Sequence, residues 1–277
     1  TLDILRIMNE EDVSVAAAVQ RVLPEIAQAV DVISENIRQG GRLIYVGAGT
    51  SGRLGVLDAV ECVPTFSVEP GLVCGIIAGG EKALTQAVEG AEDSRDMGRN
   101  DVLALGLSVH DTVVGIAASG TTPYVISAVE AANEAGVITV AITCNAPAPL
   151  LNVAQIKIAA LVGPEIIAGS TRLKAGTAQK MILNMLSTAV MIRLGKVYGN
   201  LMVDVKVTNQ KLAQRARRIV AQVAGIDQDK ATRLLEQTNY QVKPAIVMAL
   251  RRVSADEARA LLTEANGILS RVIEPPQ

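Results

Sequence analysis

Five short apolar runs recur along the chain, and segments with helical spacing separate most of them. The runs are bounded by Gly, Ser or Asn and cover residues 42–46, 72–77, 112–117, 137–142 and 156–161. Their apolar residues are continuous rather than alternating, as in strands that a parallel sheet buries on both faces. This repetition predicts an α/β fold with a doubly wound, five-stranded parallel sheet. In such sheets ligands bind beyond the carboxyl ends of the strands, so function is expected in the loops there.

Helical segments flank the predicted sheet and follow it. Residues 12–39 have apolar side chains at intervals of three and four and end at Gly40-Gly41, which predicts one helix. A long helical pattern covers residues 174–194, and another runs from Met202 to about residue 223. Beyond Gly225 the pattern changes to short helical pieces with charged faces. We therefore expect a main domain over residues 1–223 and a small helical subdomain over residues 224–277.

The first apolar run leads into a glycine-rich turn, residues 47–55, with the sequence GAGTSGRLG. Its G-x-G-x-x-G spacing between a strand and a helix fits a dinucleotide site. That use wants an acidic residue at the end of the second strand, which instead ends in Ala78-Gly79-Gly80, with Glu81 only after the turn. The hydroxyls of Thr50 and Ser51 beside helix N–H groups suit a phosphate monoester. The phosphate monoester is the favoured interpretation, and the dinucleotide is the alternative.

A second hydroxyl-rich turn follows the third apolar run at residues 117–123, where Pro123 is placed to open a helix. If this turn stood alone, helix N-capping would account for Ser119 and Thr122. Two such turns at the ends of neighbouring strands favour one anion cradle instead. The ligand contacts predicted from the two turns are Gly49, Thr50, Ser51, Ser119, Gly120, Thr121 and Thr122.

Composition narrows the chemistry further. One histidine and three widely spaced cysteines cannot build a Cys/His zinc site. With four Tyr, one Phe and no Trp, and a net charge of −2 without a basic block, nucleic-acid binding is not expected. No uncharged apolar stretch reaches the ~18 residues of a membrane span, and no signal peptide is recognised, so we predict a cytoplasmic protein without a membrane partner.

Carboxylates are the remaining candidates for acid–base chemistry. His110 lies at a polar strand entry, at the opposite end of its strand from Ser119, which makes it a poor candidate. Glu61 lies at the end of the helix that begins at the glycine-rich turn, and Glu92 lies shortly after the second strand. From composition alone, each is more often a solvated helix-end residue than a catalytic one.

Six motifs, taken together, resemble those of a known family. They cover residues 47–55, 77–81, 87–95, 117–120, 172–180 and 199–205. At these positions the chain resembles the N-acetylmuramic acid 6-phosphate etherases, a family of the sugar isomerase (SIS) domain superfamily. The resemblance extends over essentially the whole chain, residues 3–270. It implies the SIS fold, a homodimer with neither metal nor redox cofactor, and a place in bacterial cell-wall recycling.

The resemblance also implies a reaction and its residues. The family consists of carbon–oxygen lyases that cleave the D-lactyl ether of N-acetylmuramic acid 6-phosphate, giving N-acetylglucosamine 6-phosphate and D-lactate. The family's proton donor in its Glu-Cys-x-Pro stretch corresponds to Glu61, and the glutamate in its Glu-Gly-Ala-Glu-Asp stretch corresponds to Glu92, which we assign as the base. Thr121 departs from the pattern, since some relatives carry Arg there.

Several alternatives stay open at this point. Lys174 and Arg172 open the helix after the fifth strand, where they either neutralise a substrate anion or lie in solvent. The C-terminal helical region resembles a ubiquitin-associated (UBA-like) bundle by fold only. Two rival functions are a non-catalytic phosphosugar-binding regulator, with the helical region as a partner-binding module, and an aldose–ketose phosphosugar isomerase.

Overall fold

A computed structural model describes residues 1–205, 207 and 209–274. The chain divides into two compact units, each continuous in space but not in sequence. The first unit comprises Thr1–Val60 and Pro70–Val190, and the second comprises Glu61–Glu69 and Met191–Gln277. The division predicted at residue 223 stays a prediction.

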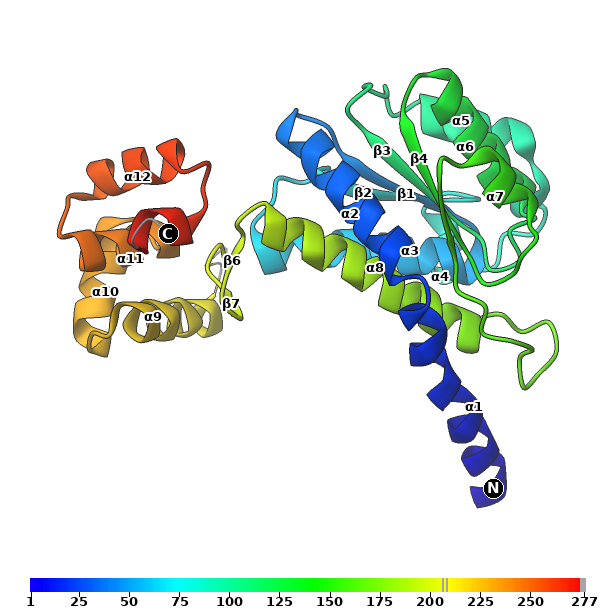
Figure 1. Ribbon diagram of the computed structural model, residues 1–277, viewed down its shortest axis with the longest axis horizontal. Coiled ribbons are helices and arrows are strands. Elements are labelled where there is room, and N and C mark those ends of the chain that lie inside the picture. The colour runs from blue at the N-terminus through cyan, green and yellow to red at the C-terminus, as the bar shows by residue number, and fades with distance from the viewer. Residues whose placement is uncertain (206, 208, 275–277) are drawn as a thin grey trace. The chain divides into compact units, whose positions relative to one another are not determined.

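The first unit is built around a parallel five-stranded sheet, as predicted (Figure 1). The strands β1 to β5 lie in the order β2-β1-β3-β4-β5. Their bounds are Leu43–Gly47, Val73–Ile77, Thr112–Ile116, Ile138–Thr143 and Ile156–Ala159. Gly47, the last residue of β1, is in register with Ile77 of β2 and Ile116 of β3, so these three strands end at one edge. The chain leaves β1 toward β2 and returns on its other side as β3, which makes this edge the topological switch point where α/β sheets bind ligands.

Helices cover both faces of the sheet (Figure 1). On one face α6 packs on β1, β3 and β4 and contacts α5 and α7. Separately, α2 contacts β5. The helices of this unit from α2 to α8 have the bounds Leu23–Arg38 for α2, Gly49–Phe66 for α3, Lys82–Thr85 for α4, Arg95–Leu103 for α5, Pro123–Glu134 for α6, Pro149–Val153 for α7 and Lys174–Arg193 for α8. The side chains of β1 alternate between the two faces: Ile44 and Val46 join the core around α6, whereas Tyr45 donates a hydrogen bond to Asp58 of α3.

The helix predicted over residues 12–39 is two helices, α1 (Leu2–Gln20) and α2. The break falls at Arg21 and Val22, and Pro24 occupies the second position of α2. Proline lacks the N–H that would continue the earlier helix, and its ring clashes with the carbonyl four residues before it. Proline is tolerated in a first helical turn, where N–H groups have no partner in the helix. The apolar periodicity continues through the break, which is why spacing alone did not reveal it.

The second unit contains a short hairpin and a helical bundle. The hairpin strands β6 (Val197–Tyr198) and β7 (Leu201–Met202) pair antiparallel, and they replace the start of the helix expected from Met202. The helices that follow are α9 (Gln210–Ala224), α10 (Gln228–Gln237), α11 (Val242–Arg251), α12 (Ala255–Glu264) and α13 (Leu269–Ile273). Val220, Leu235 and Ile246 belong to one apolar core that α9, α10 and α11 share.

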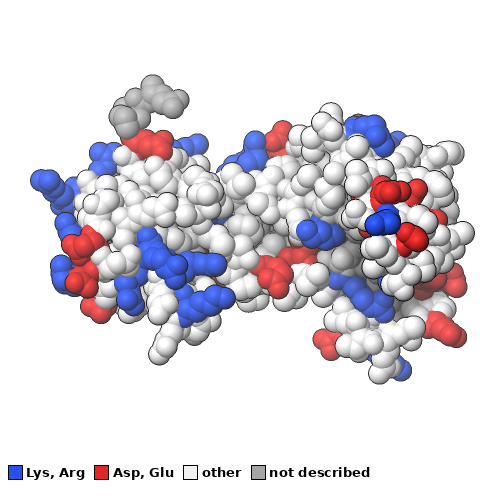
Figure 2. Space-filling model, turned by 90° about the horizontal axis from the view of Figure 1, so that it is seen from below, with Lys and Arg blue, Asp and Glu red and all other residues white. Residues whose placement is uncertain are grey.

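Charges of both signs occur over the surface. Figure 2 shows acidic and basic side chains on the same face, in keeping with 26 Lys and Arg against 28 Asp and Glu. Among the described residues, no helix combines the length and apolar character needed to cross a bilayer.

Candidate functional site

The glycine-rich turn connects β1 directly to the first turn of α3. A Cβ on Gly47 would lie 2.6 Å from the backbone nitrogen of Gly52, and a Cβ on Gly52 would lie 2.6 Å from Cγ1 of Ile77. These glycines therefore let the strand, the helix and the neighbouring strand approach closely. Gly49 adopts a φ of +53°, a left-handed conformation that glycine adopts without strain. The turn places Thr50 and Ser51 among the first, unbonded N–H groups of α3, where the helix dipole favours an anion.

The second turn follows β3, and its hydroxyls face one another. Ser119 Oγ and Thr121 Oγ1 lie 2.8 Å apart, and Ser119 Oγ accepts a hydrogen bond from the Thr121 backbone N–H at 3.2 Å. Gly120 has a φ of +69° and packs so closely on Ala148 that an added Cβ would lie 2.5 Å from the alanine Cβ. Thr122 occupies the N-cap position of α6 but makes no side-chain capping hydrogen bond. Its hydroxyl is thus available to a ligand, contrary to the capping explanation.

The two turns line one cavity of about 500 Å³ at the switch-point edge. Glu92 and Asp93 line it as well, from a short 3-10 helix (Ala91–Asp93) that follows a left-handed Gly90. Residues from the predicted set that line this cavity are Gly49, Thr50, Ser51, Glu92, Ser119, Thr121 and Thr122. The cavity has the volume of a small-molecule site, and hydroxyls, backbone N–H groups and carboxylates converge in it.

A neighbouring cavity of about 250 Å³ shares Ala48, Gly49 and Glu92 with the first. Arg53 lines this second cavity, where its guanidinium donates hydrogen bonds to the backbone carbonyls of Leu84 and Gln86 at 3.2 and 3.1 Å. The arginine therefore fixes part of the loop that leads to Glu92.

The remaining predicted residues lie elsewhere. Glu61 is exposed on α3, within the segment that groups with the second unit. Gly120 shapes its turn from a buried position. Lys174 is 3% exposed, and its ammonium pairs with Glu11 of α1, so it does not lie in solvent. Together with Arg172, these two residues line a separate cavity of about 170 Å³.

Three polar residues at the site were not predicted from the sequence. Asp93 and Thr171 line the cavity. Gln179 of α8 is fully buried, and its Oε1 accepts a hydrogen bond from Ser51 Oγ at 2.9 Å. Thr171 lies beside the 172–180 motif and Gln179 within it, but nothing in the local pattern distinguished Gln179 from an ordinary helical residue.

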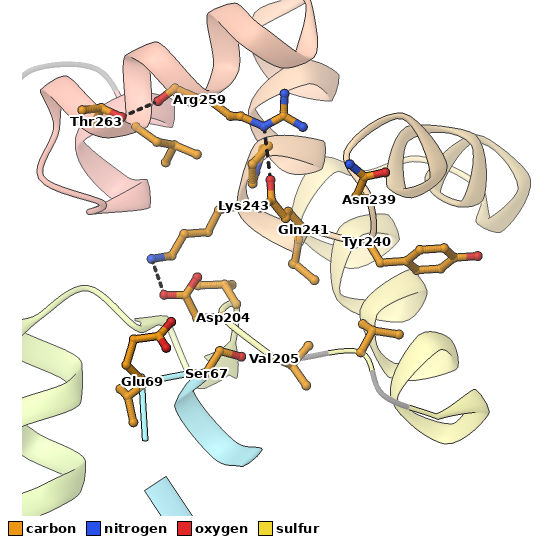
Figure 3. Close-up of a pocket in the computed structure, with 16 residues that line it drawn as sticks. Ser67, Glu69, Asp204, Val205, Asn239, Tyr240, Gln241, Lys243, Arg259 and Thr263 are labelled. Atoms are coloured by element: carbon orange, nitrogen blue, oxygen red, sulfur yellow. Dashed lines mark hydrogen bonds and ion pairs between the residues drawn. The ribbon is translucent and has the colours of Figure 1, made fainter. Parts of the chain in front are cut away.

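A larger cavity, of about 610 Å³, lies within the second unit (Figure 3). Lys243 extends into it and donates hydrogen bonds to Asp204 Oδ2 and to the Gly267 carbonyl, both at 2.8 Å. Burial lowers the pKa of Lys243, and Asp204 partly opposes that effect. Arg259 also lines this cavity, and its guanidinium donates hydrogen bonds to Asp256 Oδ1 and Gln241 Oε1. Because these cations already have anionic or polar partners, this cavity offers no cradle for a phosphate comparable to the one at the sheet edge.

Comparison with known families identifies this parallel sheet, with its hydroxyl-lined switch-point cavity, as that of a SIS-domain protein. The SIS domain profile matches residues 90–189, that of the glucokinase regulatory protein N-terminal SIS domain matches residues 25–133, and that of the C-terminal lid domain of glucokinase regulatory protein matches residues 199–246. A phosphoheptose isomerase structure from Francisella tularensis has the same fold, with a TM-score of 0.55 and 21% identity, covering 69% of this chain and 98% of that one.

Sequence relatives narrow the class to one family. An N-acetylmuramic acid 6-phosphate etherase from Clostridium beijerinckii is 53% identical over 99% of this chain and 90% of its own length. One from Bacillus licheniformis is 55% identical with the same coverage of both chains. The chain belongs to the N-acetylmuramic acid 6-phosphate etherase family.

Proposed function

We propose that this protein is a lyase that cleaves the D-lactyl ether of N-acetylmuramic acid 6-phosphate and releases N-acetylglucosamine 6-phosphate and D-lactate. Family membership supports the reaction. The structural observation that carries the proposal is the shared cavity, in which Glu92 lines the same space as the two hydroxyl-rich turns. A phosphate bound at one end of such a site holds the sugar carbons at a fixed distance from the carboxylate.

The 6-phosphate binds at the turns. N–H groups at the start of α3 and the hydroxyls of Thr50, Ser51 and Ser119 supply its hydrogen bonds, and the helix dipole stabilises its charge. This contact is remote from the reacting carbons, so its binding energy positions the substrate for the chemical step. Lys174 is a further predicted contact, and its approach to the substrate requires that its ion pair with Glu11 open.

The reaction proceeds by elimination followed by hydration. In the open-chain sugar, the C1 aldehyde makes the C2 proton acidic. Glu92 removes this proton, the electron pair forms the C2–C3 double bond, and the C3–O bond breaks with its pair passing to the lactyl oxygen, which takes a proton from Glu61. The proton held by Glu92 exchanges with solvent. Water then adds at C3 and gives a proton to Glu61, while Glu92 delivers a solvent-derived proton to C2. Each of these proton transfers typically contributes about 10²–10⁴-fold to the rate.

We propose a cytoplasmic homodimer that acts in cell-wall recycling, where phosphorylated amino sugars are formed and consumed. Sedimentation equilibrium of the purified chain tests the dimer.

Glu92 is the residue on which the proposal depends most. Glu92→Gln keeps the size and hydrogen-bonding shape of the side chain but removes its basicity, so D-lactate release should fall by at least ~100-fold. Calorimetric binding of N-acetylglucosamine 6-phosphate should be largely retained. Asp96→Asn, an exposed change four residues away on α5, serves as the matched control and should leave the rate unchanged.

Two outcomes contradict this proposal. Folded wild-type protein that releases no D-lactate from N-acetylmuramic acid 6-phosphate would refute the activity, and interconversion of fructose and glucosamine phosphates would point to an isomerase instead. Full activity in the Glu92→Gln protein would leave the lyase intact but remove Glu92 from its role.

A further inference from the structure

Gln179 lies directly behind the anion-binding turn. It belongs to α8, is 0% exposed, and accepts a hydrogen bond at its Oε1 from Ser51 Oγ, 2.9 Å away. Its Nε2 is buried and has no hydrogen-bond partner among the residues that the structure describes. The amide therefore carries a donor, Nε2, and an acceptor, Oε1, but only one hydrogen-bond partner, Ser51 Oγ, is available to the two atoms.

This arrangement fixes the hydrogen-bonding character of Ser51. A serine hydroxyl has one proton, and here that proton is given to Gln179, so the hydroxyl faces the cavity as an acceptor. A phosphate oxygen is itself an acceptor and needs donors. In the arrangement seen, Ser51 cannot donate to the anion that its turn is built to hold.

Rotation of the amide by half a turn reverses the roles. Nε2 then donates to Ser51 Oγ, and the serine proton is free to point at a phosphate oxygen. In either orientation one polar atom of Gln179 stays buried without a partner, Nε2 in the first and Oε1 in the second. The penalty of an unpaired buried group is thus present in both orientations, and the protein's own groups give neither orientation a strong preference.

The helix that carries Gln179 is held against α3, so rotation of the amide is the movement left to it. A Cβ added to Gly176 of α8 would lie 3.6 Å from Cγ2 of Thr50. Further along α8, Asn184 Nδ2 and Ser187 Oγ donate to Asp58 Oδ1 of α3 at 2.7 and 3.1 Å. Gln179 lies between these two contacts.

We propose that Gln179 is a positioning residue whose amide reverses when a phosphosugar binds, converting Ser51 from a hydrogen-bond acceptor into a donor. The inference rests on the proposed function, because it assigns Ser51 to the substrate phosphate. It makes a glutamine necessary at this place, since a glutamate, an aliphatic side chain or a thioether offers only one of the two roles or neither.

The test is binding of N-acetylglucosamine 6-phosphate to the full chain by calorimetry from pH 5.5 to 8. Gln179→Met removes both roles at nearly constant volume and should raise Kd about 3- to 10-fold. In Gln179→Glu at pH 8 the ionised side chain can only accept the serine proton. It also adds a buried negative charge to that of the bound phosphate, so Kd should rise roughly 100-fold. As the pH falls, burial favours the protonated acid, whose O–H can donate to Ser51, and binding should recover toward the wild-type value.

Three comparisons keep the result specific. Glu92 and Asp93, the titratable groups among the described residues that line this cavity, are common to all variants, so the Kd ratio to wild type isolates residue 179. Thr188→Glu adds a carboxylate at an exposed position of α8 and should bind like wild type at every pH. In a Ser51→Ala background, Gln179→Met should weaken binding no further, because its effect passes through the serine.

The outcomes distinguish this inference from the proposed function. Unchanged binding by Gln179→Met, a Kd ratio for Gln179→Glu that does not vary with pH, or additive losses in the double variant would each overturn the inference. Failure of the wild-type protein to bind the phosphosugar would refute the proposed function instead. If Gln179→Glu does not fold, Gln179→Met and the double variant still decide the question.

Discussion

Asp58 is a buried acid that joins three elements beneath the site. It is 6% exposed and accepts hydrogen bonds from Tyr45 of β1 at 3.0 Å and from Asn184 and Ser187 of α8 at 2.7 and 3.1 Å. Burial raises its pKa above the ordinary 3.8, and the three hydrogen bonds only partly oppose this effect. The fold therefore binds a proton at Asp58 more readily than the unfolded chain does.

This raised pKa gives a stability prediction with a definite sign. The folded protein binds a proton at Asp58 more readily than the unfolded chain does, so protonation stabilises the fold and the stabilisation is lost as the pH rises through the folded pKa. Urea unfolding from pH 7 down toward pH 4 should show wild type gaining free energy of unfolding relative to Asp58→Asn. A difference in free energy of unfolding between the two proteins that stays constant, or one in which wild type becomes less stable relative to Asp58→Asn as the pH falls, would contradict this prediction.

The strands β1 and β3 are tied at their amino ends, opposite the site. Asp111, 1% exposed and next to the first residue of β3, accepts hydrogen bonds from the backbone N–H and Nε of Arg42 at 2.8 and 3.1 Å. Burial alone would raise the pKa of Asp111, but hydrogen bonds from Arg42 and from the Ser108 N–H outweigh it and hold that pKa below its ordinary value. The pair fixes the register of two strands whose other ends carry the anion-binding turns.

Removal of the arginine should be costly because it leaves a buried carboxylate without its counter-charge. Arg42→Met should lower the free energy of unfolding at pH 7 by about 3–5 kcal/mol, measured by chemical denaturation. The loss should shrink in acid, because the wild-type pair itself is lost as the pH falls through the lowered pKa of Asp111. A loss below ~1 kcal/mol would show that the pair behaves like an exposed surface ion pair.

Regular elements followed from local patterns, and their exceptions have local physical causes. Continuous apolar runs predicted all five strands. The strands β1 and β3 are buried throughout, whereas the edge strand β5 alternates between buried and more exposed residues and carries the exposed Lys157. The prediction of a single helix over residues 12–39 was wrong, because Pro24 permits a helix to begin but not to continue through it. The hairpin at Val197–Met202 was missed because two-residue strands are too short to show a period.

Over the whole chain, the contacts between residues far apart in the sequence are the part of the site that local sequence patterns could not predict. The two turns could be placed at one edge because each follows the carboxyl end of a strand in a predicted parallel sheet, and the cavity holds Thr50, Ser51 and Ser119 together with Glu92. The bond between Ser51 and Gln179 spans 128 residues, and no spacing rule connects them. The burial of Lys174 against Glu11 of α1 likewise depends on packing that a linear pattern does not contain.

The path of the C2 proton tests the central claim, cleavage of the ether by elimination and hydration, most directly. The enzyme is allowed to convert N-acetylmuramic acid 6-phosphate completely in D₂O, and proton NMR follows the C2 hydrogen of the sugar product. The account predicts one D-lactate per sugar and the loss of the C2 proton signal, because a solvent deuteron replaces the proton removed at C2. Lactate release with the C2 proton retained would show direct displacement at the ether carbon and would contradict the mechanism.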